Sequence, residues 1–282
     1  MRGIFTISQL TIHEALRKRV LLAALLLGLA FLILFALGIY FMNRELIETS
    51  RGPETQAQRA LVYIFLTMAG LYAVNFLMVM MAALLPVDTL SGEIRSGAIQ
   101  SLVTKPLRRA EIVLGKWLGF WVILAGYLLL MGGGVLLIAR LVSNITPPKP
   151  NIAIGLGLML LEATLLLTIA IAGGTRLSTL ANGVLVFGLF GLAFLGGWIE
   201  QIGSLFQNET AHYIGIIASL IVPSESLWQL AAYNMQPSLM RDMTLTPFSP
   251  ASVPSNMMIV WALGYILIVL LIGLWSFRTR DL

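Results

Sequence analysis

The sequence has no cysteine among its 282 residues and only two histidines. Without cysteine there are no disulfide bonds, no thiolate nucleophiles and no cysteine ligands for a metal ion. The two histidines, His13 and His212, are far apart in the chain and are expected on opposite sides of a membrane, so they cannot share a site. We therefore expect no metal site and no cofactor bound to this chain.

Charged residues are also scarce: they make up 11% of the chain, against about 25% in a soluble domain. Hydrophobic residues account for 58%, which indicates an integral membrane protein with lipid as a partner. A net charge of +5 would suggest nucleic acid in a soluble protein. Here the lysines and arginines cluster at the ends of apolar stretches, which is typical of orientation in a bilayer, so we expect no nucleic acid partner.

Six apolar stretches are long enough to cross a hydrocarbon core of about 30 Å, which needs about 20 helical residues. They are residues 20–41, 61–85, 117–139, 152–172, 182–202 and 257–277. The preceding residues 1–19 include Glu14 and a basic cluster, and no small-residue cleavage site follows the first apolar stretch, so we expect an interfacial amphipathic helix and not a signal peptide. The predicted fold class is an all-α integral membrane protein.

The distribution of basic residues predicts the orientation. With both termini in the cytoplasm, twelve of the 18 lysines and arginines fall on the cytoplasmic side and six fall outside. Cytoplasmic loops of membrane proteins carry the excess of these residues. We therefore expect cytoplasmic N- and C-termini.

The long outer segment, residues 203–256, contains a further apolar run at 211–222. This run is too short to span a membrane and stops before Pro223, which predicts a re-entrant helix. Ser224 is expected to cap a second helix with Glu225 in its first turn. Trp228 and Tyr233 are expected at the membrane interface.

The inner segment, residues 86–116, lies between the second and third spans and carries five basic residues. The helical spacing of Ile94, Ala98 and Leu102 predicts an amphipathic helix over residues 93–103. An ordinary connector is the alternative interpretation, but antiparallel spans need only about two to eight residues between them. The length therefore favours a surface that docks a partner.

The sequence GEIRSGAIQSLVTKPLRRAEIVLGK in this segment resembles the inner loop of ABC type-2 permeases, in particular the group that includes the nitrous-oxide-reductase maturation permease. The residues that match the family pattern in order are Glu93, Gly97, Leu102, Pro106, Arg108, Glu111, Ile112, Gly115 and Lys116. The N-terminal IHEALRKRVLL resembles the family's elbow helix, with Glu14 and Arg17 or Arg19 in place. Leu107 departs from the small capping residue that the family often has, which leaves the start of the next helix open.

The resemblance implies a type V exporter-like permease in a bacterial cytoplasmic membrane, working as a homodimer or with a related permease. Two cytoplasmic ATPase subunits would bind ATP and magnesium and grip the inner segment as a coupling helix. The residues that the resemblance assigns to ATPase coupling are Glu93, Arg95, Gly97, Ile99, Leu102, Pro106 and Arg108. This chain itself has no GxxxxGK[ST] phosphate loop and no nucleophile and base arrangement, so we expect no catalytic residue and no enzyme.

Glu162 lies halfway along the fourth span, where ionisable groups are costly and are candidates for function. With Asn75 and Thr168 it is a candidate for the translocation path; the alternative is an acid that tethers helices by hydrogen bonds. Two other functions stay open: a proton-coupled secondary transporter using Glu162, and a membrane-embedded enzyme with Glu162 and Glu200 as acid and base.

We expect one transmembrane domain over residues 1–282. Its parts are an elbow helix (1–19), spans one and two (20–85), a coupling loop (86–116), spans three to five (117–202), an outer re-entrant segment (203–256), and span six with a tail (257–282).

Overall fold

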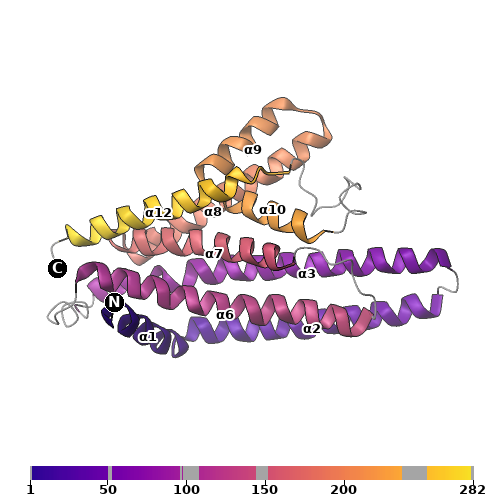
Figure 1. Ribbon diagram of the computed structural model, residues 1–282, viewed down its shortest axis with the longest axis horizontal. Coiled ribbons are helices and arrows are strands. Elements are labelled where there is room, and N and C mark those ends of the chain that lie inside the picture. Colours follow the sequence, from indigo (N-terminus) through magenta and orange to yellow (C-terminus); the bar gives the residue numbers. More distant parts are fainter. Residues whose placement is uncertain are drawn as a thin grey trace.

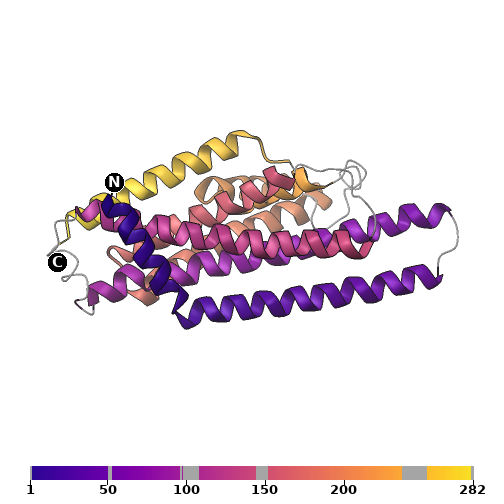
Figure 2. The same cartoon turned by 60° about the horizontal axis from the view of Figure 1, so that its bottom comes forward.

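The computed structural model describes residues 2–49, 53–95, 97, 108–143, 152–236 and 253–280. In these ranges the chain is helical apart from short turns and connections, with no strand. The start of α1 (Arg2–Leu16) and the end of α12 (Met257–Arg278) lie at the same end of the molecule as the start of α6 (Arg109–Ser143) (Figures 1 and 2). We call this the terminal end, and it includes residues 2, 95, 108, 176 and 280.

Within the described ranges, six helices are long and apolar enough to cross a membrane, as the sequence predicts. They are α2 (Arg19–Thr49), α3 (Pro53–Val87), α6 (Arg109–Ser143), α7 (Ile152–Gly174), α8 (Thr179–Leu205) and α12 (Met257–Arg278). The 35 residues of α3 make a helix about 52 Å long at about 1.5 Å per residue. Since the hydrocarbon core is only about 30 Å thick, α3 extends well beyond it.

The first helix, α1 (Arg2–Leu16), lies obliquely across α6 (Figure 2). Two glycines of α6 allow the close approach. A Cβ atom at Gly115 would stand 2.6 Å from the Cβ of Ile7, and one at Gly119 would stand 2.8 Å from the Cβ of Thr11. Larger residues at either glycine would force α1 away from the bundle. On the opposite face of α1, Phe5 is exposed, which suits contact with lipid.

The predicted helices of the outer segment are present as α9 (Glu209–Ile221) and α10 (Ser224–Met235), bent by 104° at the break between them. Helix α9 folds back along α8, where an added Cβ at Gly196 or Gly203 would collide with an alanine of α9. Helix α10 turns inward, so that Trp228 packs on Tyr72 of α3 with ring centroids 5.2 Å apart.

This inward turn corrects two predictions about the outer segment. Trp228 is only 3% exposed, so it belongs to the core and not to an interface belt. Ser224 is the first helical residue of α10 and does not cap it; the cap position is Pro223, which offers no side-chain hydrogen bond. The 104° bend accounts for the first error, because it turns toward the core a face of α10 that its own sequence marks as interfacial.

The core is centred on α7, which packs against α3, α6, α8, α10 and α12. Its residues from Glu162 to Ile171 are all buried. Met78 and Met81 of α3 are also buried, at 0% and 2% exposure, and pack in this core. The polar groups inside α7 therefore face protein and not solvent or lipid.

Candidate functional site

The short helix α4 (Thr89–Arg95) continues α3 after a turn at Asp88 and begins the inner segment. The sequence predicts a helix at 93–103; α4 begins earlier, at Thr89, and extends to Arg95, while residues 96 and 98–103 lie outside the described residues. Gly97 has a φ of 74°, a left-handed conformation that favours glycine and interrupts a helix. Among the expected coupling residues, Ile99, Leu102 and Pro106 lie outside the described residues.

An ion pair joins α4 to α6. The Nζ of Lys116 lies 2.5 Å from Oε1 of Glu93, with side-chain exposures of 3% and 20%. The sequence marks both residues as part of the inner segment, and the structure shows that they are partners. Because Lys116 is almost completely enclosed, its ammonium depends on this carboxylate for compensation.

Lys18 is a contact of the inner segment that the sequence interpretation missed. Its Nζ donates a hydrogen bond of 3.2 Å to Oγ1 of Thr89, which ties the connection between α1 and α2 to α4. Burial lowers the pKa of the Lys18 ammonium, and the charge of Lys116 lowers it further, against the opposite effect of Asp88 and Glu93.

The expected elbow residues differ from Lys18 in their exposure to solvent. Glu14 and Arg17 are exposed, and a backbone hydrogen bond of 3.2 Å from Arg17 N to Glu14 O closes the turn after α1. The sequence of the basic cluster does not show which of Arg17, Lys18 and Arg19 points inward. The packing of α1 against α6 decides which one does.

A second set of hydrogen bonds joins the start of the inner segment to α8. The Thr179 hydroxyl donates to Oδ1 of Asp88 at 2.7 Å and lies 3.0 Å from the Ser91 hydroxyl. Nearby, the Asn182 amide donates to the carbonyl oxygens of Val87, at 3.3 Å, and Ala170, at 2.8 Å. Helices α3, α4, α7 and α8 are thereby linked within two helical turns.

The other end of the inner segment is tied to α12. Arg109 donates to the carbonyl oxygens of Arg278, at 3.1 Å, and Arg280, at 2.6 Å. The helix start that Leu107 leaves open is at Arg109, and the Glu111 carboxylate accepts a 3.1 Å hydrogen bond from the Arg108 backbone N–H. This is how an acid in the first turn stabilises a helix. The side chains of Arg95 and Arg108 are exposed.

The candidate path residues lie inside the helix bundle. Glu162 is 1% exposed, and its Oε2 accepts a 2.9 Å hydrogen bond from the Asn75 amide of α3. Thr168 has different partners: its Oγ1 accepts from Trp117 Nε1 at 2.9 Å and donates to the Thr164 carbonyl at 2.7 Å. The structure therefore brings Asn75 and Glu162 together and places Thr168 in a separate contact.

The two carboxylates considered as an acid and base pair also lie in different contacts. Glu200 of α8 lies 3.3 Å from Nδ1 of His212 on α9. A third acid, Glu225 of α10, belongs to the predicted outer segment but is buried as well. Glu225 is 8% exposed because α10 turns inward.

A family model described as ABC-2 family transporter protein matches residues 6–282. The chain belongs to the ABC-2 transporter family. This membership and the six apolar helices identify a multi-pass membrane protein.

Two relatives of this ABC-2 family chain carry the description probable ABC transporter permease protein NosY. The relative from Stutzerimonas stutzeri is 34% identical over 147 residues, 51% of this chain and 49% of that protein. The relative from Pseudomonas aeruginosa is 32% identical over 182 residues, 63% of this chain and 62% of that protein. The similarity therefore spans less than two thirds of the length of either relative.

In this ABC-2 family chain, the contacts at the terminal end consist of one ion pair and several hydrogen bonds between helices. They join α4 to the connection before α2, to α6 and to α8, and they join α6 to α12. Such contacts fix the orientation of these helices relative to one another.

Proposed function

We propose that the chain is the membrane permease subunit of an ATP-binding cassette transporter, and that a separate ATPase drives it through the inner segment. Family membership supports a permease role. The observation that carries the coupling role is the enclosed ion pair between Glu93 and Lys116, together with the hydrogen bonds of Asp88 and Thr89 to α8 and Lys18.

The proposed mechanism is mechanical. Two ATPase subunits close on binding ATP and press on the inner segments of two permease copies, either identical or related. Force on α4 passes through Lys116 to α6 and through Thr179 to α8, so that these spans tilt together. Export is the proposed direction, with the termini and the inner segment in the cytoplasm of a bacterial cell, as the excess of basic residues favours.

Within this mechanism we assign Glu162 a tethering role. Its carboxylate is enclosed between α3, α7 and α10, and it binds Asn75 of its own protomer. A residue that lines a path between protomers would face outward from the bundle. The same enclosure argues against a proton-coupled route or an enzyme site at Glu162, because both require access for a proton or a substrate.

The coupling role can be tested with spin labels, since the cysteine-free chain accepts single cysteines without background. Leu180→Cys places a label at an exposed position near the start of α8, and Tyr213→Cys places one at an exposed position of α9. The permease is purified gently together with its ATPase, and label distances are compared with and without ATP and vanadate. We expect an ATP-dependent change in the unmodified permease and its loss in Glu93→Ala.

The matched control is Glu209→Ala, which removes an exposed glutamate from the first turn of α9. This control should keep the ATP-dependent change. An ATPase that fails to co-purify, with no response to ATP in any variant, would contradict the permease proposal. A response that persists in Glu93→Ala would contradict only the coupling role of the ion pair.

A further inference from the structure

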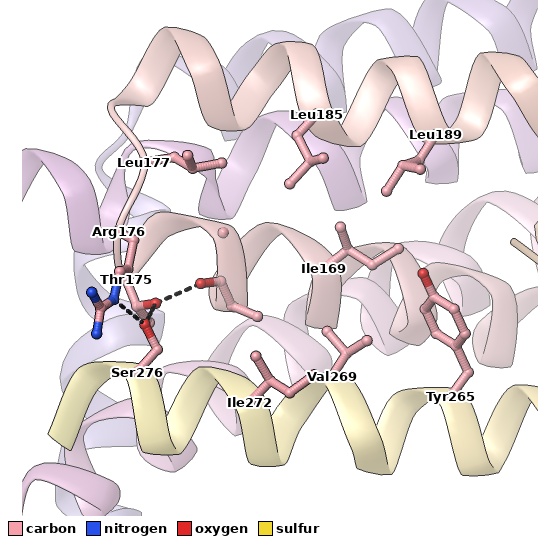
Figure 3. Close-up of a pocket in the computed structure, with 12 residues that line it drawn as sticks. Ile169, Thr175, Arg176, Leu177, Leu185, Leu189, Tyr265, Val269, Ile272 and Ser276 are labelled. Atoms are coloured by element: carbon pink, nitrogen blue, oxygen red, sulfur yellow. Dashed lines mark hydrogen bonds between the residues drawn. The ribbon is translucent and has the colours of Figure 1, made fainter. Parts of the chain in front are cut away.

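A groove of about 330 Å³ lies between α7, α8 and α12. Figure 3 shows Leu185 and Leu189 pointing from α8 toward Ile169 of α7, while Val269 and Ile272 point into the same space from α12. Leu185 and Ile272 are 38% and 56% exposed, so the groove is open at the surface of the bundle. In a multi-pass protein this surface faces lipid or another protein.

The length of the groove corresponds to one leaflet of a bilayer. Ser276 lines one end and Tyr265 lines the other, eleven positions apart on α12. Eleven residues of helix rise about 16 Å, and half of the hydrocarbon core is about 15 Å. The groove thus runs from the terminal end of the bundle to about the middle of the membrane.

The terminal end of the groove carries a positive charge with neutral partners. Arg176 donates from Nε to the Ser276 hydroxyl at 2.9 Å and from Nη2 to the Thr279 hydroxyl at 3.0 Å. Within the described part of the chain, no carboxylate forms an ion pair with Arg176. Arg280 lies beside it and donates to the Thr175 carbonyl. The two hydroxyl groups orient the guanidinium, and neither of them carries a negative charge.

We propose that this groove binds an anionic phospholipid of the leaflet at the terminal end. One acyl chain lies along Leu185, Leu189 and Ile272, and the phosphate lies against Arg176. Basic pockets between transmembrane helices are suited to anionic headgroups, and an arginine binds phosphate oxygens through two parallel hydrogen bonds.

The dimensions favour a lipid chain over other occupants. The cavity volume lies at the small end of the range of about 300 to 1,000 Å³ for ligand sites, which suits a single acyl chain. Its apolar walls have no polar group between the hydroxyl and arginine end and Tyr265. A free anion would use only Arg176, whereas a phospholipid matches the charge at the end and the apolar walls along the length.

The test is lipid retention by the purified full chain, measured by native mass spectrometry after delipidation in detergent. Phosphatidylglycerol, phosphatidylcholine and inorganic phosphate are titrated separately. We expect phosphatidylglycerol to bind more tightly than phosphatidylcholine. Arg176→Gln should weaken phosphatidylglycerol binding about five-fold, the effect of one basic residue near a membrane surface, and leave phosphatidylcholine binding nearly unchanged.

Two control variants isolate the groove. Arg278→Gln removes an exposed charge from the same end of α12 but does not line the groove, so it should retain the lipid. Leu185→Trp fills the apolar part and should reduce lipid binding, whereas Val184→Trp, at the neighbouring exposed position outside the groove, should not. All four positions are exposed, so these variants are expected to fold.

Three results would overturn the proposal. Equal weakening by Arg176→Gln and Arg278→Gln would mean that the lipid responds only to net charge. Displacement of the bound lipid by inorganic phosphate, with no effect of Leu185→Trp, would mean an anion site without a lipid chain. Unchanged lipid retention in both Arg176→Gln and Leu185→Trp would mean that the groove is empty or is covered by another protein copy.

Discussion

Removing the carboxylate of Glu93 is the most informative single change, because its partner Lys116 is 3% exposed while Glu93 itself is 20% exposed. The two halves of the ion pair therefore have unequal access to water. Glu93→Ala leaves an ammonium enclosed in the protein. Lys116→Met leaves a glutamate whose side chain is 20% exposed, and it replaces the lysine stem with an apolar side chain of similar length.

We therefore expect the two variants to lose different amounts of unfolding free energy. Loss of one partner from a buried ion pair lowers the free energy of unfolding by about 3 to 5 kcal/mol. Because Glu93 is partly exposed, we expect Glu93→Ala at the lower end of this range, about 3 kcal/mol. Lys116→Met should cost about 1 kcal/mol, as for an exposed pair.

Thermal unfolding of the purified chain measures the difference, with the fluorescence of its six tryptophans as the signal. A cost of about 3 kcal/mol should lower the melting temperature of Glu93→Ala by about 6 to 12 °C. The loss in Lys116→Met should be about a third of that. The double variant should melt close to Lys116→Met, because no enclosed charge is left. Glu209→Ala, at an exposed position, serves as the control.

Equal losses in the two single variants would refute the argument from unequal burial. A double variant as unstable as the sum of the single ones would show that the residues do not act as a pair. The double variant also separates stability from function: if it folds well but shows no ATP-dependent change, the ion pair serves coupling and not only folding.

Three smaller changes test other contacts in the same unfolding assay. Gly119→Ala should destabilise the protein because its Cβ would stand 2.8 Å from an α1 side chain, whereas Gly126→Ala, with no atom within 4 Å, should not; equal effects would contradict the close packing of α1. Asn75→Ala should cost about 0.6 kcal/mol more in the unmodified chain than in a Glu162→Met background, and additive costs would exclude the tether. Gly97→Ala should cost about 1 to 2 kcal/mol, since its φ of 74° is strained for alanine, and an unchanged melting temperature would contradict that conformation.

The six spans and their order could be predicted from the sequence, because the length of an apolar run is set by the thickness of the bilayer and needs no knowledge of neighbours. The helix ends were less predictable. The helices α2, α3 and α6 run well past their apolar parts, because polar side chains at a helix end do not interrupt the backbone hydrogen bonds. Gly97, which lies inside the predicted coupling helix, has a left-handed conformation that the apolar spacing does not indicate.

The inner segment could be located from its composition, but its contacts could not. Glu93 and Lys116 are 23 positions apart, and Asp88 and Thr179 are 91 apart. No periodicity connects residues at such separations. The sequence pattern does not single out Lys18 from the arginines on either side of it. Lys18 contacts α4 only because α1 lies across α6.

The sequence by itself determined that the chain is a membrane protein, how many times it can cross, and which loop is rich in charge, since these properties depend on the free energy of transferring each segment into lipid. Only the tertiary structure decided which polar groups meet. It enclosed Glu162, Glu225 and Trp228, and it left Arg176 at the end of an apolar groove. The physical reason is that pairing between helices depends on the bend after α9 and on close contacts at glycines, which involve residues remote in sequence.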